Sequence, residues 1–192
     1  MYDFFKKSYY YSYSLVQISY IFLYRLLYNN YKEHRPAIKN KDYISNIPAL
    51  FNDCTYIIDN IYLGSIYNAC NENLIKELNI KRIINITIDS PNFCDSIEYY
   101  NYKIKDDGKD EFSLEKLEEM CNFIKKNNNN ILVHCMFGKS RSCTLVLFYL
   151  MKYHNMNLDE AFKFVENKRY VINPSIAFYN YLKDIEINLN KL

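Results

Sequence analysis

From about residue 55 onward, short apolar runs alternate with longer segments whose apolar positions recur every three or four residues. Short runs rich in β-branched and aromatic residues are typical of strands, and the longer spacing is typical of helices. Strands that alternate with helices favour an α/β fold, with a central, mostly parallel sheet of about five strands flanked by helices. The strands are expected at Tyr56–Ile58, Ile61–Leu63, Arg82–Ile88, Tyr99–Ile104 and Ile131–His134.

The expected helices are marked by capping residues and by their apolar faces. Asn71 is placed to cap a helix around Leu74–Leu78, and Ser113 is placed to cap the next one. Thr144–Tyr153 is apolar on most faces, which predicts a buried helix. Two further helices are expected at Leu158–Val165 and Ile176–Leu189.

Residues 1–52 differ in character and are expected to form a Tyr-rich extension and linker before one folded domain at residues 53–192. Within the extension, residues 9–28 carry a single charge, on Arg25, but include several Ser residues. A membrane span needs roughly twenty apolar residues, so this segment is marginal. A helix packed on the domain or on a partner is the preferred interpretation, and membrane association through residues 9–28 stays open as the alternative.

Composition and charge narrow the classes of function. The chain has 192 residues and a formal net charge of +2, which does not indicate nucleic acid as a partner. The six cysteines form no CxxC pair and no zinc-type cluster with histidine, so no metal ligand set is expected. Reduced thiols and a cytoplasmic location are predicted, with membrane or organelle association through the N-terminal segment as the alternative.

Candidate chemistry gathers where the last apolar strand ends. Cys135 follows that strand, a short loop follows Cys135, and a helix begins near Arg141. Loop N–H groups and a helix N-terminus together bind anions and lower the pKa of a nearby thiol. A guanidinium can hold two phosphate oxygens at once. Cys135 is therefore predicted to be a nucleophile and Arg141 a phosphate clamp, with phosphate also bound by the loop residues Met136, Phe137, Gly138, Lys139 and Ser140.

The sequence His134-Cys135-x-x-Gly138-x-x-Arg141 resembles the signature of the protein tyrosine phosphatase superfamily, and Ser140-Arg141-Ser142 resembles its dual-specificity branch. The resemblance extends over about residues 55–189. It implies a catalytic domain of this fold that hydrolyses phosphotyrosine and phosphoserine or phosphothreonine in proteins through a phosphocysteine, without a cofactor or metal. It also implies that His134 orders the loop and that Ser142 assists phosphocysteine breakdown. Ser175 stands where the family often has a loop-bracing Asn.

The family also carries a general acid on a loop upstream of the cysteine. Here the sequence Ile104-Lys105-Asp106-Asp107-Gly108 lies between an expected strand and an expected helix. Asp107 is the preferred candidate because it lies farther from the strand and precedes the glycine. Asp106 and the more remote Asp110 are alternatives, and a plain turn would have the same composition.

Two other functions compete with protein dephosphorylation. Lys139 and the segment of residues 9–28 would suit a phosphatase of phosphoinositides or other lipids at a membrane. A non-catalytic phosphate-binding pseudophosphatase is the third possibility. The presence of Cys135, Arg141 and a candidate acid argues against it, because binding alone needs no thiol.

Overall fold

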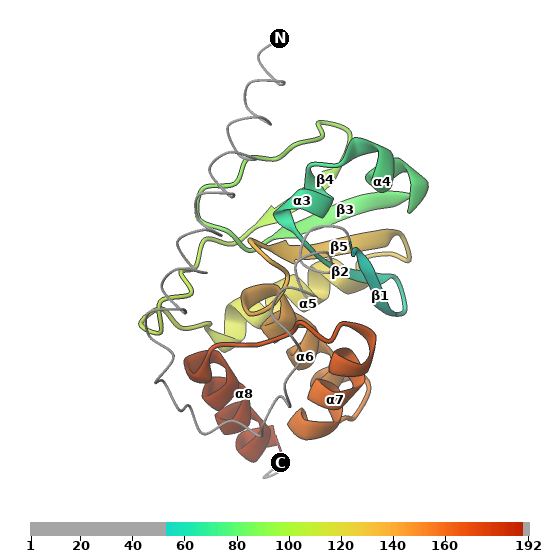
Figure 1. Cartoon of the computed structure of the whole chain (residues 1–192). Helices are drawn as coiled ribbons and strands as arrows, with labels where there is room; N and C mark the ends of the chain where they lie inside the picture. Colours follow the sequence, from blue (N-terminus) through green and yellow to red (C-terminus); the bar gives the residue numbers. More distant parts are fainter. Residues whose placement is uncertain (1–52, 190–192) are drawn as a thin grey trace. The chain divides into compact units, whose positions relative to one another are not determined.

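The computed structural model describes residues 53–189, which form a five-stranded sheet with helices on both faces (Figure 1). The strand order is β1-β2-β5-β3-β4, and only the β1–β2 pairing is antiparallel. The predicted fold class is therefore confirmed. The strands are β1 (Thr55–Ile58), β2 (Ile61–Ser65), β3 (Ile80–Asn85), β4 (Glu98–Asn101) and β5 (Asn130–Cys135).

In the described part of the chain, two short helices and four longer ones cover the sheet. The predicted caps are confirmed: the Asn71 side chain accepts a hydrogen bond from the N–H of Leu74, and that of Ser113 accepts one from Lys116. The short helices are α3 (Ile66–Ala69) and α4 (Glu72–Glu77). The longer ones are α5 (Leu114–Lys125), α6 (Arg141–Tyr153), α7 (Leu158–Lys168) and α8 (Ile176–Leu189).

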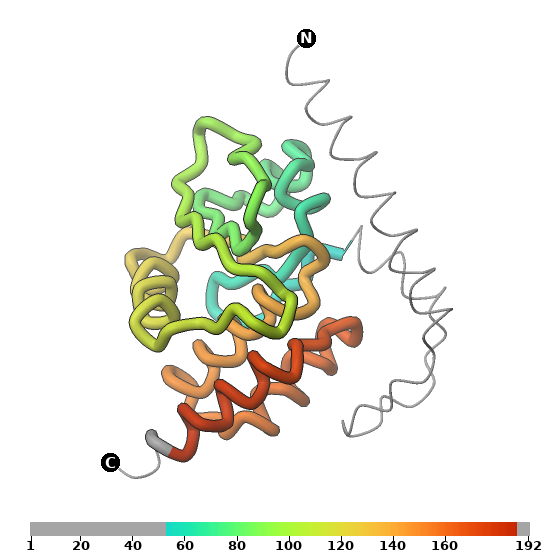
Figure 2. Tube along the Cα trace, turned by 90° about the vertical axis from the view of Figure 1, so that its left-hand side faces the viewer, coloured from blue at the N-terminus to red at the C-terminus, as the bar shows by residue number. Residues whose placement is uncertain are grey.

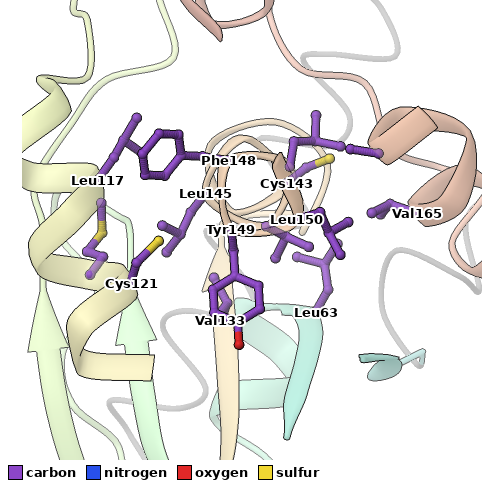
Figure 3. Packing of buried hydrophobic residues seen from close by; sticks show 14 of the residues in the cluster. Leu63, Leu117, Cys121, Val133, Cys143, Leu145, Phe148, Tyr149, Leu150 and Val165 are labelled. Atoms are coloured by element: carbon purple, nitrogen blue, oxygen red, sulfur yellow. The ribbon is translucent and has the colours of Figure 1, made fainter. Parts of the chain in front are cut away.

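Successive side chains along a strand lie on opposite faces of the sheet, so the strands contribute to two separate cores. Ile131 and Val133 of β5 pack into the larger core around α6, whereas Leu132 between them packs into the smaller core beside α3 and α4. Figure 3 shows α6 at the centre of the larger core, with its buried side chains Leu145 and Leu150 directed at the surrounding elements. The largely apolar helix is thus surrounded by protein, as its sequence predicts.

Strand ends differ from the prediction. β3 stops at Asn85, short of Ile88, because Thr87 turns the chain: its hydroxyl donates to Asn85 Oδ1 and accepts from the N–H of Ser90. β4 pairs with β3 only as far as Asn101, so it also ends early. The segment that follows β4 and contains Asp106 runs beside the loop that joins β5 to α6 (Figure 2). The N-terminal extension, with residues 9–28, lies outside the described residues.

Candidate active site

The loop between β5 and α6 is held from outside by Arg169, which is buried to 2% exposure. Its Nε donates to the carbonyl of Gly138 at 3.0 Å, and Nη2 donates to that of Phe137 at 3.3 Å. Nη1 donates to the carbonyl of Asp53 at 2.6 Å and to the hydroxyl of Thr55 at 3.1 Å. One guanidinium therefore ties the loop to the chain leading into β1.

Two more loop carbonyls have backbone partners. The N–H of Ile66 donates to the carbonyl of Met136 at 3.3 Å, and the N–H of Asn173 donates to that of Lys139 at 2.8 Å. In a planar trans peptide the N–H points away from the preceding C=O. Because the carbonyls turn outward, the loop N–H groups turn toward the centre of the loop, where they can bind an anion.

The loop needs glycine at one position. Gly138 has φ +65°, and a Cβ there would collide with the carbonyl of Gly64 at the end of β2. Two of the three glycines of the chain thus pack against each other beneath the loop. This contact brings the loop close to β2.

Cys135 ends β5 at the base of this loop and is 2% exposed. The hydroxyl of Ser142 donates to its Sγ at 3.2 Å. Burial acts to raise the pKa of the Cys135 thiol, but the charge of Arg141 and hydrogen bonds from the side chain and backbone of Ser142 outweigh it. The pKa therefore lies below the ordinary thiol value, which favours a nucleophilic thiolate.

Arg141 opens α6 and is held at one end of its guanidinium. Its Nη1 donates to the carbonyl of Ile104 at 3.1 Å, and its Nε lies 4.0 Å from Asp106 Oδ2. Nε is buried and, among residues 53–189, has no hydrogen-bond partner. A buried donor of this kind can be satisfied by an oxygen of a bound phosphate.

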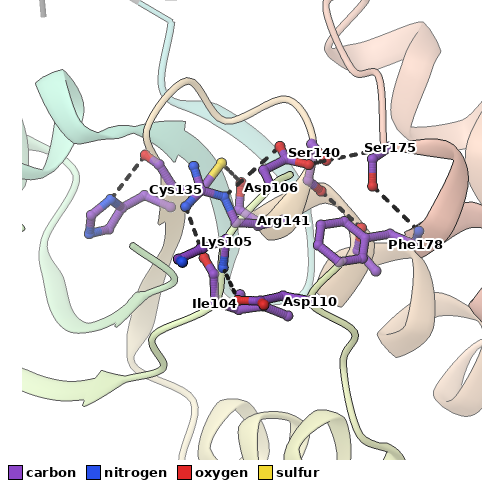
Figure 4. Close-up of polar contacts among 12 residues, drawn as sticks. Ile104, Lys105, Asp106, Asp110, Cys135, Ser140, Arg141, Ser175 and Phe178 are labelled. Carbon is purple, nitrogen blue, oxygen red and sulfur yellow. Dashed lines mark hydrogen bonds and ion pairs between the residues drawn. The ribbon is translucent and has the colours of Figure 1, made fainter. Parts of the chain in front are cut away.

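Asp106 is the carboxylate that the fold brings to this site (Figure 4). Its Oδ1 accepts a hydrogen bond from the hydroxyl of Ser140 at 3.0 Å. Its side chain is 28% exposed, against 12% for Arg141, so it lies between the loop and the solvent. This is where a leaving-group oxygen would need a proton.

Asp107, the preferred candidate from the sequence, points away from the loop that joins β5 to α6. It is exposed, and its Oδ1 accepts from the N–H groups of Lys109 and Asp110 at 3.0 and 3.3 Å. These hydrogen bonds lower the pKa of Asp107, which disfavours a protonated acid. Asp110 closes the same loop by accepting from the N–H of Lys105 at 2.9 Å. Of the three candidates, only Asp106 is bonded to the phosphate-loop segment.

The two supporting residues, Ser175 and His134, contact the loop segment in different ways. Ser175 contacts Ser140 through its backbone N–H, at 3.0 Å, while its own hydroxyl accepts from the N–H of Phe178 near the start of α8. The His134 ring lies 3.3 Å from the carbonyl of Cys135 through Nδ1. Burial lowers the pKa of His134 to about 4, so the ring is neutral at physiological pH.

Arg169 and the hydroxyl of Ser140 were missed by sequence reasoning. Arg169 follows the last residue of α7, and Lys168-Arg169-Tyr170 has the polar composition of a surface segment. Arg169 reaches Gly138 across 31 positions of sequence. The residues next to Arg169 in the sequence form no motif that predicts such a contact.

Comparison with known proteins agrees with this geometry. A family model for the dual specificity phosphatase catalytic domain matches residues 61–188. Dual specificity protein phosphatase 1 of Arabidopsis thaliana is 36% identical over 146 residues, covering 73% of this chain and 70% of that protein. The chain belongs to the dual-specificity phosphatase family. Dual-specificity protein phosphatase activity, the hydrolysis of phosphoric monoesters, follows from this membership.

Other relatives of this phosphatase are similar over the same domain. Human dual specificity protein phosphatase 1 is 34% identical over 135 residues, 68% of this chain but only 36% of the human protein. The solved structure of human tyrosine phosphatase-like serine/threonine/tyrosine-interacting protein has a TM-score of 0.66 at 25% identity, covering 71% of this chain and 97% of that one. That of DUSP15 has a TM-score of 0.65 at 26% identity, covering 69% and 86%.

The described part of this phosphatase has neither a metal-binding cluster nor a membrane-spanning helix. No three His, Cys, Asp or Glu side chains within residues 53–189 lie together as a metal site would require. No helix in the same range is long and apolar enough to cross a membrane.

Proposed function

We propose that this chain dephosphorylates phosphoproteins at both aryl and alkyl phosphate esters, with Cys135 as the nucleophile and Asp106 as the general acid. The observation that carries the proposal is a buried thiol of lowered pKa at the base of an anion-binding loop, with Ser142 3.2 Å from its sulfur and Arg141 opening the next helix. The hydrogen bond from Ser140 to Asp106 supports Asp106 as the acid that acts at the same loop.

In the first step the Cys135 thiolate attacks phosphorus. The P–S bond forms as the P–O bond to the leaving group breaks, and Asp106 gives its proton to the departing oxygen. Loop N–H groups and Arg141 stabilise the charge on the other three oxygens. The products are a phosphocysteine and a dephosphorylated hydroxyl group.

In the second step water attacks the phosphocysteine. The Asp106 carboxylate takes a proton from the water as the P–S bond breaks, and inorganic phosphate leaves. The hydroxyl of Ser142 stabilises the returning thiolate, which it contacts directly. Asp106 is then protonated again for the next cycle.

Kinetics of three variants test the assignment. We expect Cys135→Ser to lose activity on p-nitrophenyl phosphate and on a phosphothreonine peptide. Asp106→Asn should lower kcat for the peptide by roughly 10²- to 10⁴-fold, the usual contribution of a positioned acid. Asp107→Asn is the matched control, because within residues 53–189 this neighbouring carboxylate accepts hydrogen bonds only from the backbone of its own turn.

The assignment of roles can fail in two ways. An active Cys135→Ser variant would exclude this cysteine as the nucleophile. Equal losses in the Asp106 and Asp107 variants would exclude Asp106 as the specific acid, because charge removal anywhere in the turn would then suffice.

A further inference from the structure

The hydroxyl of Ser140 joins three segments that are far apart in sequence. It accepts a hydrogen bond from the N–H of Ser175 at 3.0 Å and donates one to Asp106 Oδ1 at 3.0 Å. The residue is 6% exposed. Sequence reasoning assigned Ser140 only to the loop that binds phosphate, with no role for its side chain.

The Ser140 hydroxyl accepts one hydrogen bond and donates one. A serine hydroxyl has one hydrogen to donate. Because the N–H of Ser175 occupies an acceptor position on the oxygen, the hydroxyl hydrogen serves Asp106 Oδ1. While this hydrogen bond is made, Oδ1 is the acceptor of Asp106, so the transferable proton of the neutral acid belongs on Oδ2.

Oδ2 is the oxygen on the side of Arg141. It lies 4.0 Å from Arg141 Nε, the buried donor without a hydrogen-bond partner among the described residues. A phosphate that satisfies Nε would therefore come near Oδ2. The hydrogen bond from Ser140 thus presents the proton-bearing oxygen to the leaving group.

Ser140 is itself fixed in place. Its carbonyl accepts from the N–H of Thr144 at 2.8 Å and from the hydroxyl of Thr144 at 3.0 Å. The residue therefore moves with the first turn of α6, which also carries Arg141. Asp106 and the phosphate clamp are attached to one rigid element.

We propose that Ser140 is a positioning residue whose hydroxyl orients Asp106 and thereby sets how well the enzyme hydrolyses alkyl compared with aryl phosphates. The inference rests on the proposed role of Asp106. An alkoxide is a poor leaving group and needs its proton during P–O cleavage, whereas nitrophenolate leaves with little help. Misplacing the acid therefore harms phosphoserine and phosphothreonine substrates most.

The test compares full-length wild type with Ser140→Ala on a phosphothreonine peptide and on p-nitrophenyl phosphate. We expect kcat/KM for the peptide to fall roughly 10- to 100-fold, the range for loss of a hydrogen bond to a charged group. Hydrolysis of p-nitrophenyl phosphate should change much less. Ser140→Thr keeps the hydroxyl and should restore the peptide activity, and inhibition by inorganic phosphate should be unchanged because the loop amides are retained.

A double variant separates this inference from the proposed function. In an Asp106→Asn background, Ser140→Ala should have little further effect, because there is no acid left to orient. Equal losses on both substrates, or additive losses in the double variant, would overturn the role of Ser140. A normal rate for Asp106→Asn alone would instead overturn the role of Asp106. If Ser140→Ala does not fold, Ser140→Cys keeps nearly the same volume with a weaker donor and should show the same substrate-dependent loss.

Discussion

Cys135 differs from the other buried thiols because of its partners rather than its burial. Burial raises the pKa of Cys121 to about 12 and raises that of Cys143 as well. Cys135 is just as buried, yet its pKa is lowered by Arg141 and Ser142. A charge and two hydrogen bonds at the start of α6 are therefore enough to reverse the effect of the surrounding apolar core.

This contrast predicts how alkylation depends on pH. A nearby positive charge favours the thiolate, so replacing it raises the thiol pKa and lowers the thiolate fraction at any pH below that pKa. In Arg141→Met, the midpoint for modification of Cys135 by iodoacetate should move to higher pH. At pH 6.5 the rate should fall on the order of tenfold. Mass spectrometry of the modified peptide follows Cys135, with Cys121 and Cys143 as internal controls that should stay unmodified while the protein is folded. Superimposable pH profiles for the two proteins would contradict this account.

The sequence locates this chemistry well but leaves the acid ambiguous. The spacing of Cys135, Gly138 and Arg141 is local, because one loop joins a strand to a helix, and it could be predicted. Asp106 and Asp107 are adjacent and chemically identical. Only the course of the turn directs one to Ser140 and the other to backbone N–H groups of its own loop. That course depends on contacts with α6, which periodicity does not reveal.

At the scale of elements, the sequence predicts which segments form strands and capped helices, but it predicts the residues at which they end less accurately. Ser113 caps α5 through a local hydrogen bond that any sequence reading can anticipate. The end of β3 is set by the side chains of Asn85 and Thr87, which interact only after the chain has turned. The short helix α3 was not predicted, since a single turn bears too few residues to show helical spacing.

Arg169, which follows α7, donates hydrogen bonds to carbonyls of the loop between β5 and α6. The contribution of these hydrogen bonds can be tested. Arg169→Met removes the donors to the Phe137 and Gly138 carbonyls, so we expect unfolding to become easier by about 3 kcal/mol. In addition, the remaining folded protein should bind inorganic phosphate more weakly, because the loop amides lose their alignment. Denaturant unfolding and inhibition by phosphate measure the two effects.

Arg82→Met provides a matched control. Arg82 is also fully buried and also donates to backbone carbonyls, including those of Ile124 and Asn127, but it lies away from the loop. It should lose a similar amount of stability without weaker phosphate binding. If both variants bind phosphate like wild type, Arg169 is a purely structural residue.

At the scale of the whole molecule, residues 53–189 hold two buried cores of their own, with members from Ile57 to Ile185. The domain predicted at residues 53–192 should therefore fold without the extension. We expect a fragment of residues 49–192 to keep the stability of the full chain within about 0.5 kcal/mol and its kcat/KM for p-nitrophenyl phosphate. A fragment that aggregates or is inactive would show that the extension belongs to the folded unit. Cosedimentation of both proteins with lipid vesicles tests the alternative of membrane association through residues 9–28, which predicts binding of the full chain and none of the fragment.

The strand order has a consequence for synthesis of the protein. β2 and β3 both leave the ribosome before β5, yet β5 is the strand that lies between them and pairs with each. A nascent chain that ends before β5 therefore has two strand edges facing an unfilled gap, a state in which strands are prone to pair wrongly. Arg169, which holds the phosphate loop, is made later still. The nucleophile therefore enters the sheet with the last strand to be made, and the arginine that holds its loop is made only afterwards.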